Sequence, residues 1–272
     1  YYIWFIKLPL DERGLLNQAA RNVFLEKVIE ALGHQLENTE KMQGQLGDNP
    51  YTFVPSQQQL ADFNAKAKTL LNNPPSNGFQ AVSEYIHAPH SHDWQLLNVQ
   101  GLADYAARLS DPMLFATLQK QWSNLAPTFQ LNLLNSLEHH AINKPLAVMI
   151  KQHFEEAITL DNESHIIACL RGLTQAPEAI TQKIIDPLLR RAYLSADWLI
   201  LIAARHMALF NDVDRAILFL EKCALHDDAI FQGLFADMVQ LPQCRIAFLQ
   251  ALSAPALSKL CQQKIQTLQQ GH

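Results

Sequence analysis

Three histidines and an aspartate lie close enough in this sequence to suggest metal binding. His87, His90 and His92 form an H-x2-H-x-H cluster, and Asp93 follows directly. Imidazole and carboxylate groups at this density could bind zinc or another borderline metal. The cluster surrounds Pro89, however, and has neither a fourth ligand nor a helical i, i+4 arrangement. A polar turn with ordinary loop histidines is therefore the favoured interpretation, and we predict no metal and no cofactor.

Three other groups of residues could in principle transfer protons or bind a metal. They are Cys223 with His226, Glu155 with Glu156, and Glu138 with His139 and His140. Catalysis needs a partly buried pair with perturbed pKa values in a cleft, whereas groups at the ends of amphipathic helices are usually solvated. The G-x-G-x-x-G, Walker, G-x-S-x-G and H-E-x-x-H patterns are all absent. We predict no catalytic residue.

A ladder of charged residues is the candidate for partner binding. Arg171 and Arg205 occupy equivalent places in consecutive helices, and Asp237 falls at the next equivalent place. Such a ladder could receive an acidic peptide segment. Hydrogen bonds between repeats are the alternative, and the pattern favours them. Trp198 is close to Arg205 in sequence, and its exposure would strengthen the binding interpretation.

Regular helix-start signals indicate the elements that carry this ladder. Pro at the first helical position and Asp or Ser at the cap are expected where helices begin. First helices are predicted to begin at Pro112, Pro145, Pro177 and Asp212, and second helices at Pro127, Asp161, Ser195 and Asp227. Equivalent starts are roughly 32–35 residues apart, the length of a two-helix repeat. Two further helices should begin near Pro242 and Pro255. We predict a HEAT-like α-solenoid of helical hairpins, with an irregular helical bundle as the alternative.

The N-terminal part has a different pattern. Residues 3–6 are apolar on both faces, which predicts a buried strand, and residues 51–54 are a candidate partner. Asp11 is predicted to cap a long helix that ends near Gly33, and a polar loop should follow from 34 to 50. The fold class is thus mainly α with a small N-terminal α+β portion. We place that portion at residues 1–93 and the helical-repeat domain at 94–272.

Composition excludes several classes of protein. The chain has 272 residues, of which 49% are hydrophobic, and a formal net charge of −5. The composition disfavours nucleic-acid binding, because such proteins usually carry a basic stripe and this chain has no Lys or Arg run beyond Arg190-Arg191. The four isolated cysteines suggest reduced core thiols and a cytoplasmic protein. Apolar runs are too short for a membrane span, and the chain opens at Tyr1 without a signal peptide, so we expect natural sequence upstream.

The segment Trp4-Phe-Ile-Lys-Leu-Pro-Leu-Asp-Glu-Arg-Gly-Leu-Leu16 resembles the middle of a family of uncharacterised proteobacterial proteins. In that family a strand leads through a Pro-Leu-Asp-Glu motif into a long helix and a helical C-terminal part. The resemblance implies a bacterial cytoplasmic protein with an upstream strand-containing segment, and it carries over no catalytic residue. Pairing of two copies through the N-terminal strand region would then give a homo-oligomer.

These observations favour a non-enzymatic helical-repeat protein that binds a protein partner, not identified by the sequence, through the concave face of its repeats or through its N-terminal part. The alternative class is an enzyme or a nucleic-acid repair factor on a HEAT-like scaffold. That class requires a cleft that combines a carboxylate, an aromatic pair and a basic rim.

Overall fold

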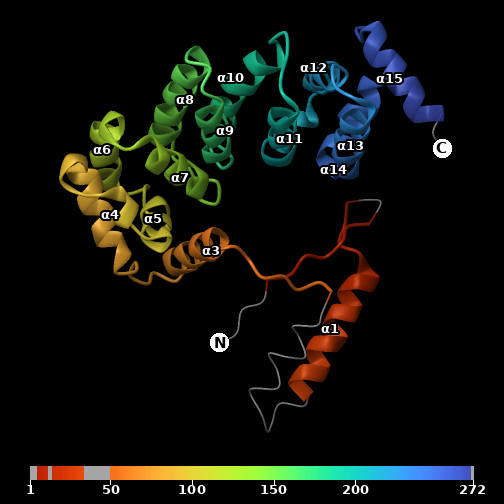
Figure 1. Cartoon of the computed structure of the whole chain (residues 1–272). Coiled ribbons are helices and arrows are strands. Elements are labelled where there is room, and N and C mark those ends of the chain that lie inside the picture. The colour runs from red at the N-terminus through yellow and green to blue at the C-terminus, as the bar shows by residue number, and fades with distance from the viewer. Residues whose placement is uncertain (1–4, 12–13, 34–49, 271–272) are drawn as a thin grey trace. The chain divides into compact units, whose positions relative to one another are not determined.

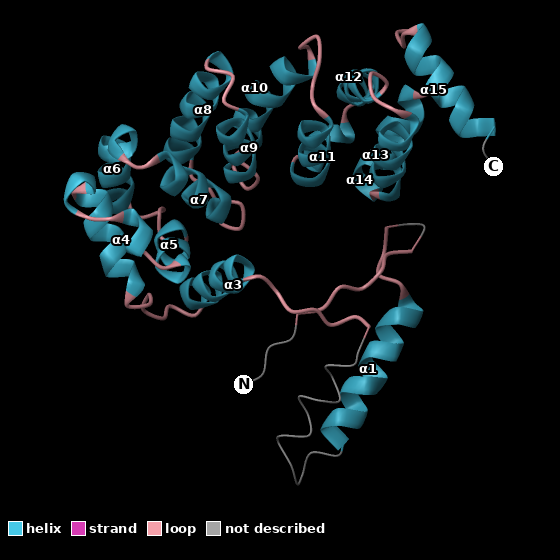
Figure 2. Ribbon diagram, viewed as in Figure 1, coloured by secondary structure: helices cyan, strands magenta, loops and turns pink. Residues whose placement is uncertain are grey.

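The computed structural model describes residues 5–11, 14–33 and 50–270. Over these ranges the chain is mainly helical, and no β-strand occurs between the helices and loops that Figures 1 and 2 show. Two compact units are present. The smaller comprises Tyr1–Ser56 with Gln240–Pro242, and the larger comprises Gln57–Val239 with Gln243–His272. The boundary expected after residue 93 falls inside the larger unit, because α3 (Gln57–Leu70) and α4 (Gly78–His87) both pack on α5 (Val99–Ala106).

The smaller unit has no β-sheet in its described residues, so the predicted strand region is wrong there. Residues 5–7 do meet residues 51–53, as an isolated antiparallel bridge between Ile6 and Thr52. Two backbone hydrogen bonds flank the bridge, at 2.8 and 3.1 Å. Proline has no N–H to donate, and Pro9, Pro50 and Pro55 surround this short pairing. Ile6 is 44% exposed rather than buried, and the expectations for residues 3 and 4 and for the loop at 34–49 lie outside the described residues.

Helix α1 spans Gln18–Gly33 and is capped by Asn17, not by Asp11. Asn17 Oδ1 accepts a hydrogen bond from the N–H of Ala20 at 3.0 Å. The Asp11 carboxylate instead accepts one from the N–H of Leu15 at 2.9 Å, in the turn before the helix. The acceptor nearest to the free N–H groups of the first turn is therefore Asn17, and the helix begins later than predicted.

The larger unit contains the remaining helices. Beyond α3, α4 and α5 they are α6 (Pro112–Gln121), α7 (Pro127–Leu137), α8 (Lys144–Thr159), α9 (Glu163–Gly172), α10 (Glu178–Leu189), α11 (Ala196–Arg205), α12 (Val213–Cys223), α13 (Asp228–Gln240), α14 (Pro242–Ala251) and α15 (Lys259–Gln270). Short 3₁₀ helices also occur: η1 (Pro89–Ser91), η2 (Trp94–Leu96), η3 (Trp122–Asn124) and η4 (Met207–Asn211). Gln240 and Pro242 belong to the smaller unit although they end α13 and begin α14.

Most of these helices begin where the sequence predicts, because the start signals act locally. Asp111 accepts hydrogen bonds from two N–H groups at the start of α6, and Asp227 accepts one from Ile230 N at 2.8 Å. Two predictions differ. Asp161 has a positive φ of 51°, and Asn162 caps α9 in its place. The helix predicted near Pro255 begins later, at Lys259, and Ser258 Oγ accepts a hydrogen bond from Cys261 N at 3.2 Å at its start.

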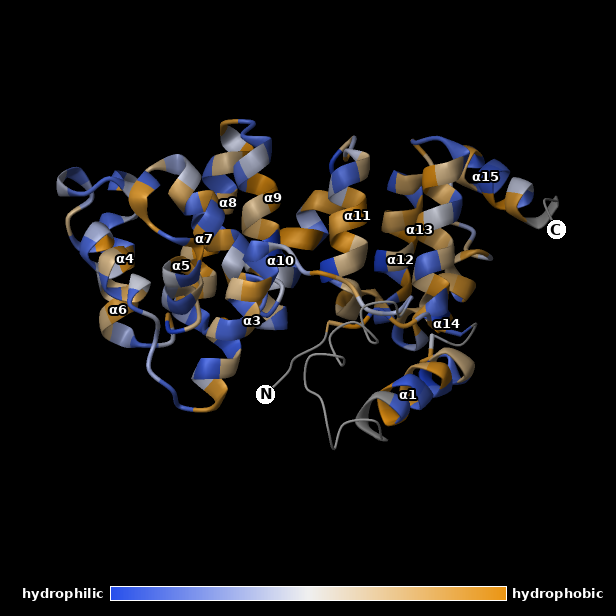
Figure 3. Ribbon diagram, turned by 60° about the horizontal axis from the view of Figure 1, so that its bottom comes forward, coloured by the Kyte–Doolittle hydropathy of each residue, from blue (hydrophilic) through white to orange (hydrophobic). Residues whose placement is uncertain are grey.

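Contacts between the helices fall into two series. Helices α3, α5, α7, α9 and α11 contact one another in that order. Contacts also join α4 to α6, and α8 to α10 and then α12. The pairs α4–α5, α8–α9 and α11–α12 connect the two series. Apolar residues gather along α9 and α11 in Figure 3, and side chains such as Leu170 and Ile202 are fully buried there. Among the described residues no helix is both long and apolar enough to cross a membrane.

Candidate functional site

The predicted ladder residues Arg171 and Arg205 converge on one carboxylate, that of Glu138. Arg205 Nε lies 2.5 Å from Glu138 Oε1, and Arg171 Nη1 lies 3.9 Å from Glu138 Oε2. The Glu138 side chain is 8% exposed, whereas those of Arg171 and Arg205 are 43% and 38% exposed. Two partly solvated guanidinium groups therefore share one buried anion.

The three residues come from the C-terminal ends of consecutive helices of one series. Glu138 directly follows α7, Arg171 is in the last turn of α9, and Arg205 ends α11. Cations are favourable at such ends, because the free carbonyl groups carry partial negative charge. Glu138 is the unfavourable member by this criterion, and the two arginines compensate its charge.

A second buried carboxylate with two cations lies at the end of the neighbouring helix α5. Asp104 has no exposed side-chain area, and it is 3.4 Å from Arg108 Nη1 and 3.8 Å from Lys68 Nζ. Asp104 Oδ2 also accepts a hydrogen bond from Ser76 N at 2.8 Å. We call the four cations Lys68, Arg108, Arg171 and Arg205 the basic edge. Each buried carboxylate of this edge is flanked by two of them.

Between these two clusters lies a polar contact of α3 with α7. Gln58 Nε2 donates to Asp62 Oδ2 at 2.9 Å and approaches Ser136 Oγ at 2.7 Å. Asp62 Oδ2 is 3.9 Å from His139 Nε2. Burial raises the pKa of Asp62, although its hydrogen bonds and His139 oppose that shift. Asp62 is thus a third buried carboxylate in this area, and Gln58 and His139 lie beside it.

Two buried histidines beside the basic edge are neutral. Burial, with smaller contributions from His139, Lys66 and Arg108, lowers the pKa of His140 to about 4. Burial likewise lowers the pKa of His206 to about 4. The Nε2 atom of His206 lies 2.9 Å from the carbonyl oxygen of Leu170 and must donate, since a carbonyl only accepts.

The other two predicted site residues do not join Arg171 and Arg205. Trp198 is 8% exposed, so the exposed indole that would have supported partner binding is not present. Its indole ring is buried where α11 packs against its neighbours. Asp237 is exposed on α13, and both arginines contact Glu138 instead.

From the sequence, Glu138 was only an acid–base candidate. The repeat spacing, however, also links Glu138 to Arg171 and Arg205. Positions 104, 138, 171, 205 and 237 are equivalent points of consecutive second helices, in steps of 34, 33, 34 and 32 residues. They carry Asp, Glu, Arg, Arg and Asp. The ladder therefore extends two repeats further towards the N-terminus than predicted.

The histidine cluster stays apart from these charges. His87 ends α4, His90 lies in η1, and His92 follows it. His87 and His92 line a hollow of about 410 Å³ together with Tyr105. Across the described residues, no group of three or more His, Cys, Asp or Glu side chains is arranged to hold a metal ion.

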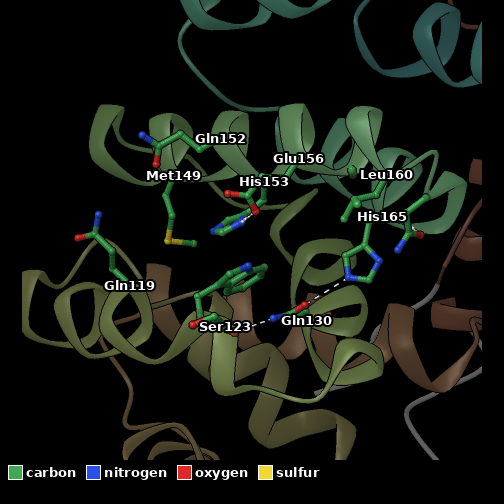
Figure 4. Close-up of a pocket in the computed structure, with 12 residues that line it drawn as sticks. Gln119, Ser123, Gln130, Met149, Gln152, His153, Glu156, Leu160 and His165 are labelled. Atoms are coloured by element: carbon green, nitrogen blue, oxygen red, sulfur yellow. Dashed lines mark hydrogen bonds and ion pairs between the residues drawn. The ribbon is translucent and has the colours of Figure 1, made fainter.

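A polar pocket that sequence reasoning did not find lies between α6, η3, α7, α8 and α9 and has a volume of about 390 Å³. In Figure 4, the side chains of Met149 and His153 of α8 point towards Ser123 and Gln130. The rings of Trp122 and His153 stack with centroids 4.8 Å apart. The lining residues are spread over many elements, and each is ordinary in its own helix, so no local pattern signals the pocket.

A chain of hydrogen bonds orders one side of this pocket. Gln130 Nε2 donates to the carbonyl oxygen of Trp122 at 2.6 Å, and Gln130 Oε1 is 3.2 Å from His165 Nε2. An amide oxygen only accepts, so the proton of His165 is on Nε2. Burial lowers the pKa of His165, with a smaller contribution from His153. His165 is therefore neutral near pH 7.

The structure thus defines a mainly helical protein that carries a basic edge and a polar pocket. The chain belongs to the family described as "Protein of unknown function (DUF3549)", whose model matches residues 1–269. This match confirms the prediction that the chain belongs to an uncharacterised family. No curated protein and no solved structure matches the chain.

Proposed function

We propose that this chain is a non-enzymatic, HEAT-like helical-repeat protein that binds an acidic segment of a protein partner along its basic edge. The observation that carries the proposal is the sharing of one buried carboxylate by two partly exposed arginines. Glu138 is 8% exposed and contacts both Arg171 and Arg205.

The order of helix contacts supports the solenoid. In a stack of helical hairpins each hairpin packs on its sequence neighbours, and equivalent helices form two parallel series. The series α3–α5–α7–α9–α11 and α8–α10–α12 have this order. The recurring starts of α6, α8, α10 and α12 agree with a repeat of two helices.

The charges of the basic edge support an acidic partner. Asp104 and Glu138 each neutralise only one of the two cations beside them, which leaves an excess of positive charge at a partly solvated surface. Guanidinium groups bind carboxylates in a planar, two-pronged geometry. The existing ion pairs between helices hold Arg171 and Arg205 in place, which lowers the entropy that binding would otherwise cost.

Binding of a fluorescein-labelled oligoglutamate peptide, followed by fluorescence anisotropy, tests the proposal. We expect Arg171→Ala/Arg205→Ala to weaken binding by about tenfold or more. The matched control is Arg190→Ala/Arg191→Ala, which removes the same charge from two exposed residues at the end of α10. Equal affinities of the two double variants would contradict the proposal.

A second titration tests the alternative class, a nucleic-acid factor on the same scaffold. A single-stranded oligothymidylate of similar charge is titrated under the same conditions. Tighter binding of the oligonucleotide than of oligoglutamate, lost in the same Arg171→Ala/Arg205→Ala variant, would favour a nucleic-acid factor on this scaffold and would overturn the acidic-peptide proposal.

A further inference from the structure

The polar pocket of Figure 4 has the composition of a site for a cation. Its lining includes the carboxylate of Glu156 and contains no Lys or Arg side chain. His165 also lines the pocket and has a lowered pKa, so it adds no positive charge near pH 7. A carboxylate with no lysine or arginine beside it in the same hollow favours a positively charged ligand.

The orientation of Glu156 is set by the protein. His153 Nδ1 lies 3.1 Å from Glu156 Oε2. An ionised carboxylate only accepts hydrogen bonds, so His153 donates this one. The His153 ring is in turn held by its stack on Trp122, with 29° between the two ring planes. The Glu156 side chain is 70% exposed, and its contact with the stacked imidazole restrains it.

The remaining lining groups favour a cation with several N–H donors. Gln119, Gln152 and Ser123 contribute side-chain oxygens that accept hydrogen bonds, and Figure 4 shows them around the same hollow. Trp122 and His153 also line the pocket, with Trp122 5% exposed and its ring stacked on that of His153. A bare metal ion would need several strong ligands at one point, which the lining does not gather.

We infer that this pocket binds a guanidinium group, held by the Glu156 carboxylate and the glutamine side chains beside the Trp122–His153 stack. The guanidinium can belong to a small molecule or to an arginine side chain of a peptide. This site is separate from the basic edge, and its ligand has the opposite charge to the acidic segment proposed there.

The test uses the full chain with 13C-labelled methionine methyl groups. The sequence has five methionines, and Met149 lines the pocket. Its methyl signal is assigned with Met149→Leu. Agmatine is one probe, and an arginine tripeptide blocked at both ends is the other. We expect the Met149 signal to shift saturably with a Kd on the order of 1 mM for at least one probe. Met238, which is buried in α13, should not shift.

Two variants make the test specific. Glu156→Gln removes the charge and should weaken binding about tenfold, because a charge-assisted hydrogen bond becomes a neutral one. Glu155→Gln is the matched control, since Glu155 is the adjacent residue, pairs with Lys151 and does not line this pocket. It should leave the affinity unchanged.

The two probes also identify the source of the ligand. Tighter binding of agmatine supports a small guanidine compound, and tighter binding of the tripeptide supports an arginine side chain. The inference is overturned if neither probe moves the Met149 signal at about 20 mM. It is equally overturned if butylurea, a neutral analogue, binds as well as agmatine, or if Glu156→Gln binds as tightly as Glu155→Gln.

Discussion

Arg205 Nε lies 2.5 Å from Glu138 Oε1, although Glu138 follows α7 and Arg205 ends α11, with α9 between them in the series. The contact joins two helices that are not sequence neighbours. Arg171 of α9 approaches the other oxygen of the same carboxylate. The buried charge of Glu138 is thus compensated from two different helices.

Replacement of Arg205 by alanine should destabilise the larger unit. The Glu138 carboxylate would keep only the 3.9 Å contact with Arg171, so we expect the free energy of unfolding to fall by about 1–2 kcal/mol. Urea unfolding followed by circular dichroism measures this change. Arg190→Ala, at an exposed position, should change it by less than about 0.5 kcal/mol. A loss in Arg205→Ala no larger than in this control would show that the ion pair contributes nothing.

Stability should fall as the pH drops from about 6.5 towards 4, because of His206. Its pKa in the folded chain is lowered to about 4 by burial, while an unfolded histidine titrates near 6.5. Between these values the unfolded chain binds more protons than the folded chain, so the free energy of unfolding decreases as pH falls. His140 is shifted in the same direction and adds to the effect.

His206→Gln identifies the contribution of His206. Glutamine can still donate to the Leu170 carbonyl but does not titrate. Chemical denaturation at a series of pH values should give a shallower slope between pH 6.5 and 4 than in the unchanged chain. Identical slopes would mean that His206 is not held neutral.

The stability of helix α6 should depend on its N-cap residue, Asp111. Asp111 Oδ1 accepts from Met113 N at 2.7 Å and from Leu114 N at 3.4 Å. Asp111→Ala should lower the free energy of unfolding by about 1 kcal/mol, and Asp111→Ser should recover most of that loss. Thermal denaturation of both variants provides the comparison, and equal losses would argue against capping by the side chain.

All four cysteines should be unreactive in the folded chain. Cys169, Cys223, Cys244 and Cys261 are free and buried. Burial raises the pKa of Cys244 to about 11 and that of Cys169 and Cys261 to about 12. The thiolate is the reactive form, so Ellman's reagent should react at least about 100-fold faster in denaturant than in buffer. Rapid reaction of one thiol in buffer would contradict its burial.

The start signals of the repeat helices could be read from the sequence because Pro, Asp, Asn and Ser act within one turn of their own position. Asp227 and Ser195 cap the helices predicted for them. The strand predicted at residues 3–6 failed in its described part for a nonlocal reason, since a strand needs an extended partner and the pairing here is a single bridge at Ile6.

The candidate site was predictable only in part. The repeat spacing placed Arg171 and Arg205 at equivalent points, but which carboxylate they contact depends on the packing of α7 against α9 and of α9 against α11. The same packing buries Trp198, whose exposure could not be predicted from the sequence. The pocket beside His153 could not be predicted, because its residues meet only after several helices are assembled.

Hydrogen exchange with bound oligoglutamate tests the central claim most directly, because it maps the surface that the acidic segment covers. We predict slower exchange at the C-terminal ends of α7, α9 and α11, where Glu138, Arg171 and Arg205 lie, and unchanged exchange in α8, α10 and α12. Protection confined to the helices of the other series, or no protection at saturating peptide, would contradict binding along the basic edge.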